Sequence, residues 1–230
     1  MFMRFFGVLA LAFCTAPVLA QTPNDYYTAR STPATAELLR NVEGHHLAQG
    51  IQQMRDKRLH AAWADFDFML RYFPNHPRAL VLMGDVCEAW RTSKCDMESY
   101  LDKAIKMSPE SDGVYLAKGV YLQKKGKLKD AIESYKKSLE LNSGSANAHY
   151  NIGLAYVADK QYPLANEHAQ KAYSMGMPFP ALKTKLVAVG AWKVIEPTPT
   201  EAASPASDNA EGTKESAAKG VPEKSADGAK

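Results

Sequence analysis

The sequence offers little of the chemistry on which enzymes depend. It contains three cysteines and six histidines in 230 residues, and it has no glycine-rich phosphate-binding loop, no nucleophile elbow and no paired-carboxylate signature. His45 and His46 are adjacent, and no two histidines lie four residues apart to supply the convergent ligands of a metal ion. His168 follows Glu167, and we interpret these two residues as solvated neighbours rather than as a catalytic dyad. We therefore expect no enzymatic activity, no cofactor and no bound metal.

A long hydrophobic run is also missing. The N-terminal apolar run Phe5–Phe13 is nine residues long, far below the roughly 20 residues that a membrane-spanning helix needs. The small-residue pattern ending at Ala20 is typical of a signal-peptide cleavage site, although a buried helix is the alternative. The residue before Cys14 is phenylalanine, which does not match the lipid-attachment box of bacterial lipoproteins. We expect 1–20 to be a cleaved signal peptide and the mature chain to be a soluble periplasmic or secreted protein without a membrane span.

Strong charge of either sign is absent as well. The formal net charge is +3 at pH 7, and the basic surplus is spread over many positions without clusters of lysine and arginine interleaved with aromatic residues. Nucleic acid is therefore not an expected partner. From Glu196 onward the chain consists mainly of Pro, Ala, Ser, Glu, Lys and Gly, with almost no large apolar residue. This composition predicts a disordered tail over 196–230.

A repeat organises the rest of the chain. The stretch that begins at Asp112 has Gly119 in its eighth place and Ala131 in its twentieth. A second stretch begins 34 residues later and has Gly153 and Ala165 in the same two places. A small residue at these places lets two antiparallel helices approach each other closely, so each stretch predicts one helix pair.

Two further units precede these, because Gly50 and Gly84 also fall in the eighth place, and four units tile 43–179 with one inserted residue. This length and these small residues resemble the tetratricopeptide repeat, here of an exported bacterial type. The resemblance implies an all-α fold, a right-handed superhelical solenoid of about four helix-turn-helix units and a C-terminal capping helix.

The segments at the two ends complete a predicted solenoid over 43–195. Residues 21–42 are interpreted as a loose lead-in followed by a helix, because Thr32 and Pro33 are typical of an N-cap and a first helical position. After Pro180 an amphipathic capping helix is expected, because a solenoid end otherwise exposes an apolar face. Its inward side would carry Leu182, Leu186, Val189 and Trp192.

Cys87 and Cys95 are the two cysteines that remain after export. Cys87 lies late in the first helix of the second unit and Cys95 just past the turn, so the two can face each other across the helix pair. Exported chains with two cysteines usually pair them. A disulfide is therefore expected, with free buried thiols as the alternative.

The resemblance also implies a ligand groove, lined by fixed places of the first helix in each unit. Carried onto this sequence, these places predict a groove of fourteen residues. They are Leu47, Ile51, Arg55, Val81, Asp85, Glu88, Leu116, Val120, Gln123, Lys124, Asn147, Tyr150, Asn151 and Leu154. The carboxylate clamp of the family requires lysine and asparagine where this chain has Leu47 and Ile51, so we expect no clamp for the C-terminal tails of chaperones.

Seven of these residues form an apolar set that we call the groove strip: Leu47, Ile51, Val81, Leu116, Val120, Tyr150 and Leu154. It predicts binding of an apolar or amphipathic segment of a partner protein, with Asp85 and Glu88 setting the register of that segment. The alternative is that neighbouring helices, the lead-in or a second copy cover the strip. The expected function is a protein-interaction scaffold of the bacterial cell envelope, similar to pilus or secretion assembly factors. The alternative is an accessory subunit of an envelope enzyme in peptidoglycan or outer-membrane assembly. The partner's identity and the oligomeric state stay open.

Overall fold

The computed structural model of the chain describes residues 23–194, so the predicted signal peptide at 1–20 and the predicted tail at 196–230 lie outside the described residues. Over this range the regular elements are all helices, and no strand is present. A short 3-10 turn, Ala29–Ser31, comes first. The helices are α1 (Pro33–Val42), α2 (Ala48–Arg55), α3 (Leu59–Tyr72), α4 (Pro77–Trp90), α5 (Met97–Met107), α6 (Asp112–Lys124), α7 (Leu128–Leu141), α8 (Ala146–Ala158), α9 (Tyr162–Ser174) and α10 (Ala181–Ala188).

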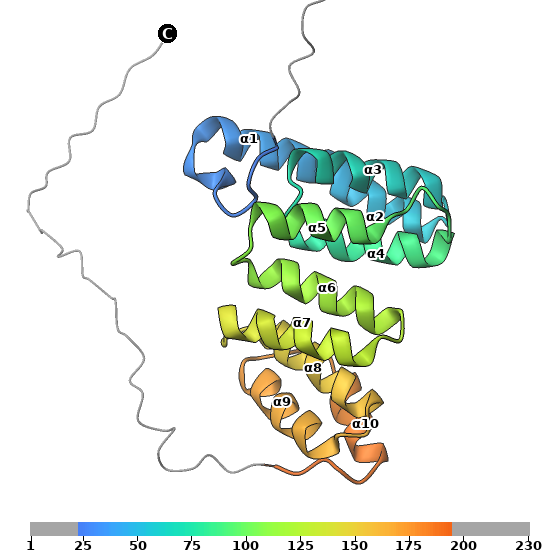
Figure 1. Cartoon of the computed structure of the whole chain (residues 1–230), viewed down its shortest axis with the longest axis vertical. Coiled ribbons are helices and arrows are strands. Elements are labelled where there is room, and N and C mark those ends of the chain that lie inside the picture. The colour runs from blue at the N-terminus through green and yellow to red at the C-terminus, as the bar shows by residue number, and fades with distance from the viewer. Residues whose placement is uncertain (1–22, 195–230) are drawn as a thin grey trace, which may run out of the picture. The chain divides into compact units, whose positions relative to one another are not determined.

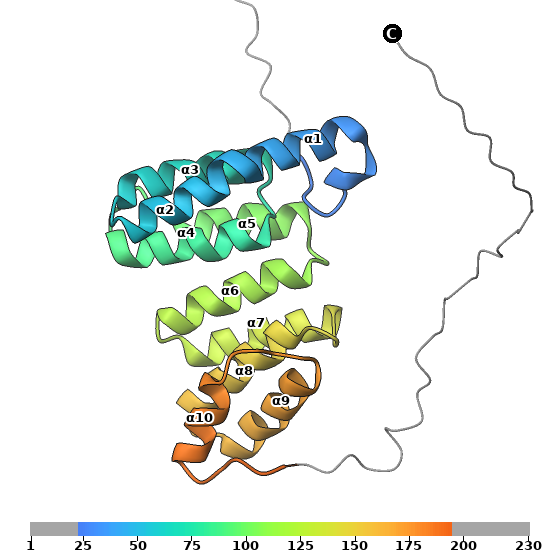
Figure 2. The ribbon, with the colours of Figure 1, turned by 180° about the vertical axis from the view of Figure 1, so that it is seen from behind.

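The predicted units are the helix pairs α2–α3, α4–α5, α6–α7 and α8–α9, which follow one another along the ribbon (Figure 1 and, from behind, Figure 2). Helix α6 contacts both helices of the preceding pair, α4 and α5, and α8 likewise contacts α6 and α7. Helix α10 contacts α8 and α9 in the same way. The prediction of an all-α solenoid with a terminal helix is confirmed.

Polar caps define where most first helices begin. Thr32, Ser111 and Ser145 each accept a hydrogen bond from the backbone N–H three residues later, which satisfies one of the free donors of the first turn. His76 does the same for α4 through its ring Nδ1, and Pro77 occupies the first helical position. The caps at His76, Ser111 and Ser145 follow one another at the repeat spacing, whereas Thr32 caps α1, which precedes the first unit.

The glycines of the eighth place bring the two helices of a pair together in two units. A Cβ atom on Gly119 would lie 2.4 Å from Cε1 of Tyr135, and one on Gly50 would lie 2.5 Å from Cε1 of Phe66. Both aromatic rings are fully buried. The second helix of these pairs therefore fills the space that the glycine leaves open.

The second unit differs from the other three. Three residues separate the paired helices in the first, third and fourth units, whereas six residues, 91–96, separate α4 from α5. Within this longer connection Arg91 has a φ of 50° and ends α4. The result is a later and shorter second helix in the unit that carries the two cysteines.

The lead-in is not loose, contrary to the sequence-based expectation. The carboxylate of Asp25 accepts hydrogen bonds from the backbone N–H groups of Tyr27 and Thr28, at 2.8 and 3.0 Å. Its other oxygen accepts from Asn75 Nδ2 at 3.1 Å and from Ser108 Oγ at 2.7 Å. Because Asn75 and Ser108 lie in the loops that follow the first and second units, this one side chain ties the lead-in to two inter-unit loops.

The two helical stretches at the N-terminus also join into one. Between α1 and α2 the residues Glu43–Leu47 form a π-helical turn without interrupting the helix. Glu43 accepts a hydrogen bond from Nε2 of the buried His76 at 3.0 Å. The expected helix up to Val42 therefore continues directly into the first repeat.

The capping helix is shorter than predicted. Helix α10 ends at Ala188, and Leu182 and Leu186 are fully buried, as expected. Val189 is 46% exposed, and Trp192 lies beyond the helix, where its ring meets that of Tyr173 at a centroid distance of 5.9 Å. The inward side thus consists of two leucines, because the chain leaves the helix before the next helical turn.

Candidate functional site

Six of the seven side chains of the groove strip are half-buried. Leu47, Ile51 and Val81 are half-buried and pack against the core of the first two units, and Leu116, Val120 and Leu154 do so in the last two. Tyr150 is buried, with its ring 6.0 Å from that of Phe179 between centroids. The strip therefore offers the edges of apolar side chains rather than a fully open patch.

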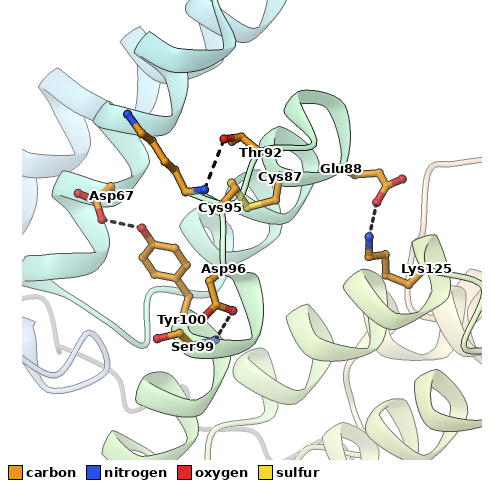
Figure 3. The surroundings of a disulfide bond; sticks show 10 residues. Asp67, Cys87, Glu88, Thr92, Cys95, Asp96, Ser99, Tyr100 and Lys125 are labelled. Carbon is orange, nitrogen blue, oxygen red and sulfur yellow. Dashed lines mark hydrogen bonds and ion pairs between the residues drawn. A yellow bond between two sulfur atoms is a disulfide. The ribbon is translucent and has the colours of Figure 1, made fainter.

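The charged residues of the predicted groove are paired within the chain. Lys124 forms an ion pair with Asp85, and Lys125 Nζ lies 3.2 Å from Glu88 Oε2. Figure 3 shows the second of these pairs joining two helices. Both pairs connect α4 to the C-terminal end of α6, across the junction between the second and third units. Asp85 and Glu88 thus already have lysine partners within the chain, and their role in setting the register of a partner stays a prediction.

The remaining polar residues of the predicted groove have local roles. Gln123 Oε1 accepts a hydrogen bond from the Tyr135 hydroxyl at 2.8 Å, so it fixes the ring that fills the glycine space in the third unit. Asn151 Nδ2 donates to the carbonyl oxygen of Asn147 at 2.8 Å, within α8. Asn147 and Arg55 are exposed. Arg55 and Asn147 are thus the groove residues most accessible to a charged or polar partner group.

The two cysteines of the second unit are bonded to each other. The Sγ atoms of Cys87 and Cys95 are 2.07 Å apart, and the bond joins the end of α4 to the connection before α5 (Figure 3). Directly after it, the Asp96 side chain accepts from the Ser99 N–H and caps α5. One turn further, the Tyr100 hydroxyl donates to Asp67 on α3 at 2.6 Å. The disulfide therefore keeps the start of α5 close to α4 and α3.

Two polar pairs occupy the same places in the first and fourth units. His46 Nδ1 lies 2.9 Å from Asp65 Oδ1, and His149 Nδ1 lies 2.8 Å from His168 Nδ1. In each pair, the residue at the fourth place of the unit contacts the residue at the twenty-third place of the same unit, which lies on the second helix. The His168 ring also stacks on Tyr156 at a centroid distance of 5.6 Å. The expectation of a solvated His168–Glu167 pair is therefore wrong, because His168 faces the inside of its helix pair.

The electrostatics of the second pair disfavour positive charge. Burial lowers the pKa of His168 to about 4, and the neighbouring His149 adds to this effect. Burial likewise lowers the pKa of His149, against a hydrogen bond to the Ser143 carbonyl that raises it. At neutral pH both rings are uncharged. Because His149 Nε2 donates to the Ser143 carbonyl, His149 Nδ1 accepts the hydrogen bond and His168 Nδ1–H donates it.

A cavity that the sequence did not indicate lies between α3 and α5, away from the groove strip. It has a volume of about 510 Å³. Its lining combines aromatic and apolar side chains with Asp67, Arg71 and Lys103, and Arg71 and Tyr100 both bond to Asp67. Asp67 is thus engaged by Arg71 and Tyr100, and Lys103 Nζ lies 5.9 Å from the centre of the Tyr100 ring.

Across residues 23–194, no group of three or more His, Cys, Asp or Glu side chains could hold a metal ion. In the same range, no helix has the length and apolar character to cross a membrane.

The arrangement of paired helices in register defines a helical-repeat solenoid, an architecture that serves as a protein-interaction scaffold. Residues 122–160, from the end of α6 to the end of α8, match the family model described as TPR repeat. This part of the chain therefore matches the tetratricopeptide repeat that the sequence predicted.

The similar proteins are distant. Protein O-mannosyl-transferase TMTC3 of Mus musculus is 28% identical over 94 residues, which are 41% of this chain and 10% of that protein. The Homo sapiens protein of the same name is 26% identical over 110 residues, or 48% and 12% of the two chains. The chain thus spans about a tenth of the length of these curated relatives.

Similar solved structures include those of MamA. One crystal structure of MamA has 19% identity and a TM-score of 0.45, covering 62% of this chain and 85% of that one. MamA from residue 41 to its end, from Desulfovibrio magneticus RS-1, has 21% identity and a TM-score of 0.43, covering 65% and 89%. Similarity at this level carries no argument about partners or function.

Proposed function

We propose that the protein is a non-enzymatic scaffold of the bacterial cell envelope and that it binds a segment of a partner protein along the groove strip. The observation that carries this proposal is the half-burial of the strip. Six of its seven residues keep part of their apolar surface in solvent, although each also packs against the core. Partly exposed apolar side chains on successive helices are suited to bind an extended or helical segment that lies across those helices.

The internal ion pairs favour an apolar mode of binding. Asp85 and Glu88 are held by Lys124 and Lys125, so a partner charge would have to displace a lysine from each. Exposed ion pairs contribute only about 0–1 kcal/mol each, so specificity from these charges alone would be weak. The partner segment is therefore expected to bind mainly through its apolar side chains.

An oxidising compartment is the second part of the proposal. The Cys87–Cys95 bond is of the kind that persists in exported proteins, whereas reducing systems keep cytosolic thiols free. Together with the signal-peptide pattern before Gln21, this bond supports a periplasmic or secreted location.

The groove is tested by changing Val120 to Thr and Leu154 to Gln in one variant. These changes make the strip more polar without placing a charge against the core. The matched control is Leu164→Gln, an apolar residue of α9 that is 39% exposed outside the strip. Crosslinking and affinity purification from the envelope fraction should recover one or more proteins with the native chain and the control, and fewer or none with the groove variant.

Circular dichroism and urea unfolding establish that all three proteins are folded. Equal recovery of the same partners by the groove variant would show that the strip is not the binding site.

A further inference from the structure

The described part of the solenoid ends on half a unit. Helix α10 contacts α8 and α9, as α6 and α8 contact the pairs before them, and its Leu182 packs against the glycine of α8. A Cβ atom on Gly153 would lie 2.6 Å from Cδ2 of Leu182. Helix α10 therefore has the position of the first helix of a fifth unit, and its expected partner, a second helix, does not follow it in residues 23–194.

The repeat spacing identifies the side of α10 that lacks a neighbour. Val187 lies 34 residues after Gly153 and so occupies the eighth place of this fifth unit. In the first and third units the residue at that place, Gly50 or Gly119, faces an aromatic ring of the second helix of its own pair. In the second and fourth units Gly84 and Gly153 face a side chain of the next first helix. Val187 thus lies on the side of α10 against which a further helix of the array would pack. It is 56% exposed.

Apolar exposure concentrates at this end of the solenoid. Seven large hydrophobic residues of the described chain are exposed, and five of them fall between 175 and 194. They are Met175, Phe179, Val187, Val189 and Val194. A terminal repeat usually presents a polar outer face to water, so this end has the composition of an interface rather than of a cap.

The segment after α10 covers only part of this end. Lys193 is held against α9 by Asn166, whose side chain both accepts from the Lys193 N–H at 3.1 Å and donates to its carbonyl at 2.8 Å. Lys183 Nζ lies 5.0 Å from the centre of the Trp192 ring. This returning segment leaves Val187 and Val189 in solvent.

The charge of the end favours an acidic occupant. Residues 175–194 contain three lysines, Lys183, Lys185 and Lys193, and no aspartate or glutamate. A second copy docked end to end through the same face would bring these lysines opposite one another, which is unfavourable. The following sequence is also unsuited to form the missing helix, because Pro197, Pro199 and Pro205 fall in the corresponding span.

We propose that a partner protein completes the fifth unit by packing an acidic amphipathic helix against α10 at Val187. This surface is separate from the groove strip, since no residue of the strip lies on α10. The proposal does not depend on occupancy of the groove.

The probe is a synthetic 14-residue helical peptide with alanine and leucine on one face and glutamate on the other, labelled for fluorescence anisotropy. Its control has lysine in place of every glutamate. The full chain should bind the glutamate peptide at least about tenfold more tightly than the lysine peptide, and Val187→Asp should weaken that binding by a similar factor. The matched control variant is Leu164→Gln, an exposed residue of α9 outside the groove strip, which should bind the glutamate peptide like the native chain.

Four results would overturn the proposal. Equal binding of both peptides would show that charge plays no part, and unchanged binding by Val187→Asp would place the peptide elsewhere. A dimer of the full chain that Val187→Asp dissociates would identify a second copy as the occupant. Binding that appears only after residues 195–230 are removed would identify that segment as the occupant.

Discussion

At the scale of single residues, the glycines of the eighth place are not equivalent. The space above Gly119 is filled by the ring of Tyr135, whereas the atom nearest to a Cβ on Gly84 is Cδ2 of Tyr121, at 3.9 Å, which is an ordinary contact. Glycine within a helix otherwise costs roughly 0.5–1 kcal/mol relative to alanine. Gly119 is therefore required by packing, and Gly84 is not.

This difference predicts opposite effects of the same substitution. Gly119→Ala should lower the free energy of unfolding by about 1–3 kcal/mol, because the buried ring of Tyr135 must move. Gly84→Ala should raise it by about 0.5–1 kcal/mol through helix propensity. Urea unfolding followed by circular dichroism measures both, and the two variants serve as controls for each other. A loss of stability in both would show that the second unit is packed as tightly as the third.

The His149–His168 pair predicts acid sensitivity. The pKa of His168 in the native protein, about 4, is below the ordinary value near 6.5 for an exposed histidine. Between these values the unfolded chain binds more protons than the native chain, so protonation favours unfolding. The stabilising contribution is present above about pH 6.5 and is lost as the pH falls toward 4.

The measurement is the urea midpoint between pH 7 and pH 4.5 for the native chain and for His168→Gln, which cannot titrate. The midpoint of the native chain should fall more steeply over this range. His60→Gln is the matched control, since His60 is an exposed histidine of α3 outside this pair. Parallel curves for His168→Gln and the native chain would contradict the assignment.

At the scale of elements, the lead-in is held by long-range polar contacts. Burial raises the pKa of Asp25, but hydrogen bonds from Ser108, Thr28, Tyr27 and Asn75 outweigh it and hold the pKa below its ordinary value. The Ser111 hydroxyl, which caps α6, also donates to the Tyr27 hydroxyl at 2.6 Å. Hydrogen bonds thus fix the lead-in to two inter-unit loops, although its regular structure is limited to the single turn Ala29–Ser31.

The second unit carries a cross-link between Cys87 and Cys95. Intact-mass analysis of protein from its native compartment should show the Cys87–Cys95 bond as a gain of two hydrogens on reduction. Changing both cysteines to serine should lower the free energy of unfolding by at most about 2–3 kcal/mol, because the closed loop is short. Reductant should then have no effect on this variant. Two free thiols in the native protein, or sulfur-linked dimers, would contradict the bond.

At the scale of the whole folded part, the units depend on their neighbours in sequence. Helices α6 and α8 have a unit on each side, whereas α10 contacts only the preceding pair, α8 and α9. Stability in such arrays is approximately a sum of unit and nearest-neighbour contributions. The last helix should therefore open with the lowest free energy.

Hydrogen exchange followed by mass spectrometry tests this order. Amides of α10 should exchange faster than those of α6 and α7, and the glutamate peptide should slow exchange in α10 without changing α4. Helix α4 is the internal control because it has neighbours on both sides. Equal protection of α10 and α6 would show that the end is already complete.

The repeat could be located from the sequence because its determinants are local. Gly119 and Tyr135 are sixteen residues apart in one helix pair, and the same spacing recurs in the first unit, Gly50 and Phe66. The order of helices, the all-α fold and the pairing of the two cysteines follow from such short-range patterns. The fourteen groove residues follow from the repeat places as well, although the binding of a partner segment to them stays a prediction.

Contacts between distant residues were decided only by the tertiary structure. The pairing of Asp85 with Lys124 spans two units, and that of Asp25 with Ser108 spans 83 residues. No periodic pattern marks either, because each depends on how one helix pair is stacked on the next. The same stacking leaves the side chain of Val187 56% exposed. The sequence by itself thus determined the repeating unit, and the packing between units determined which charges are neutralised and which apolar surface is left open.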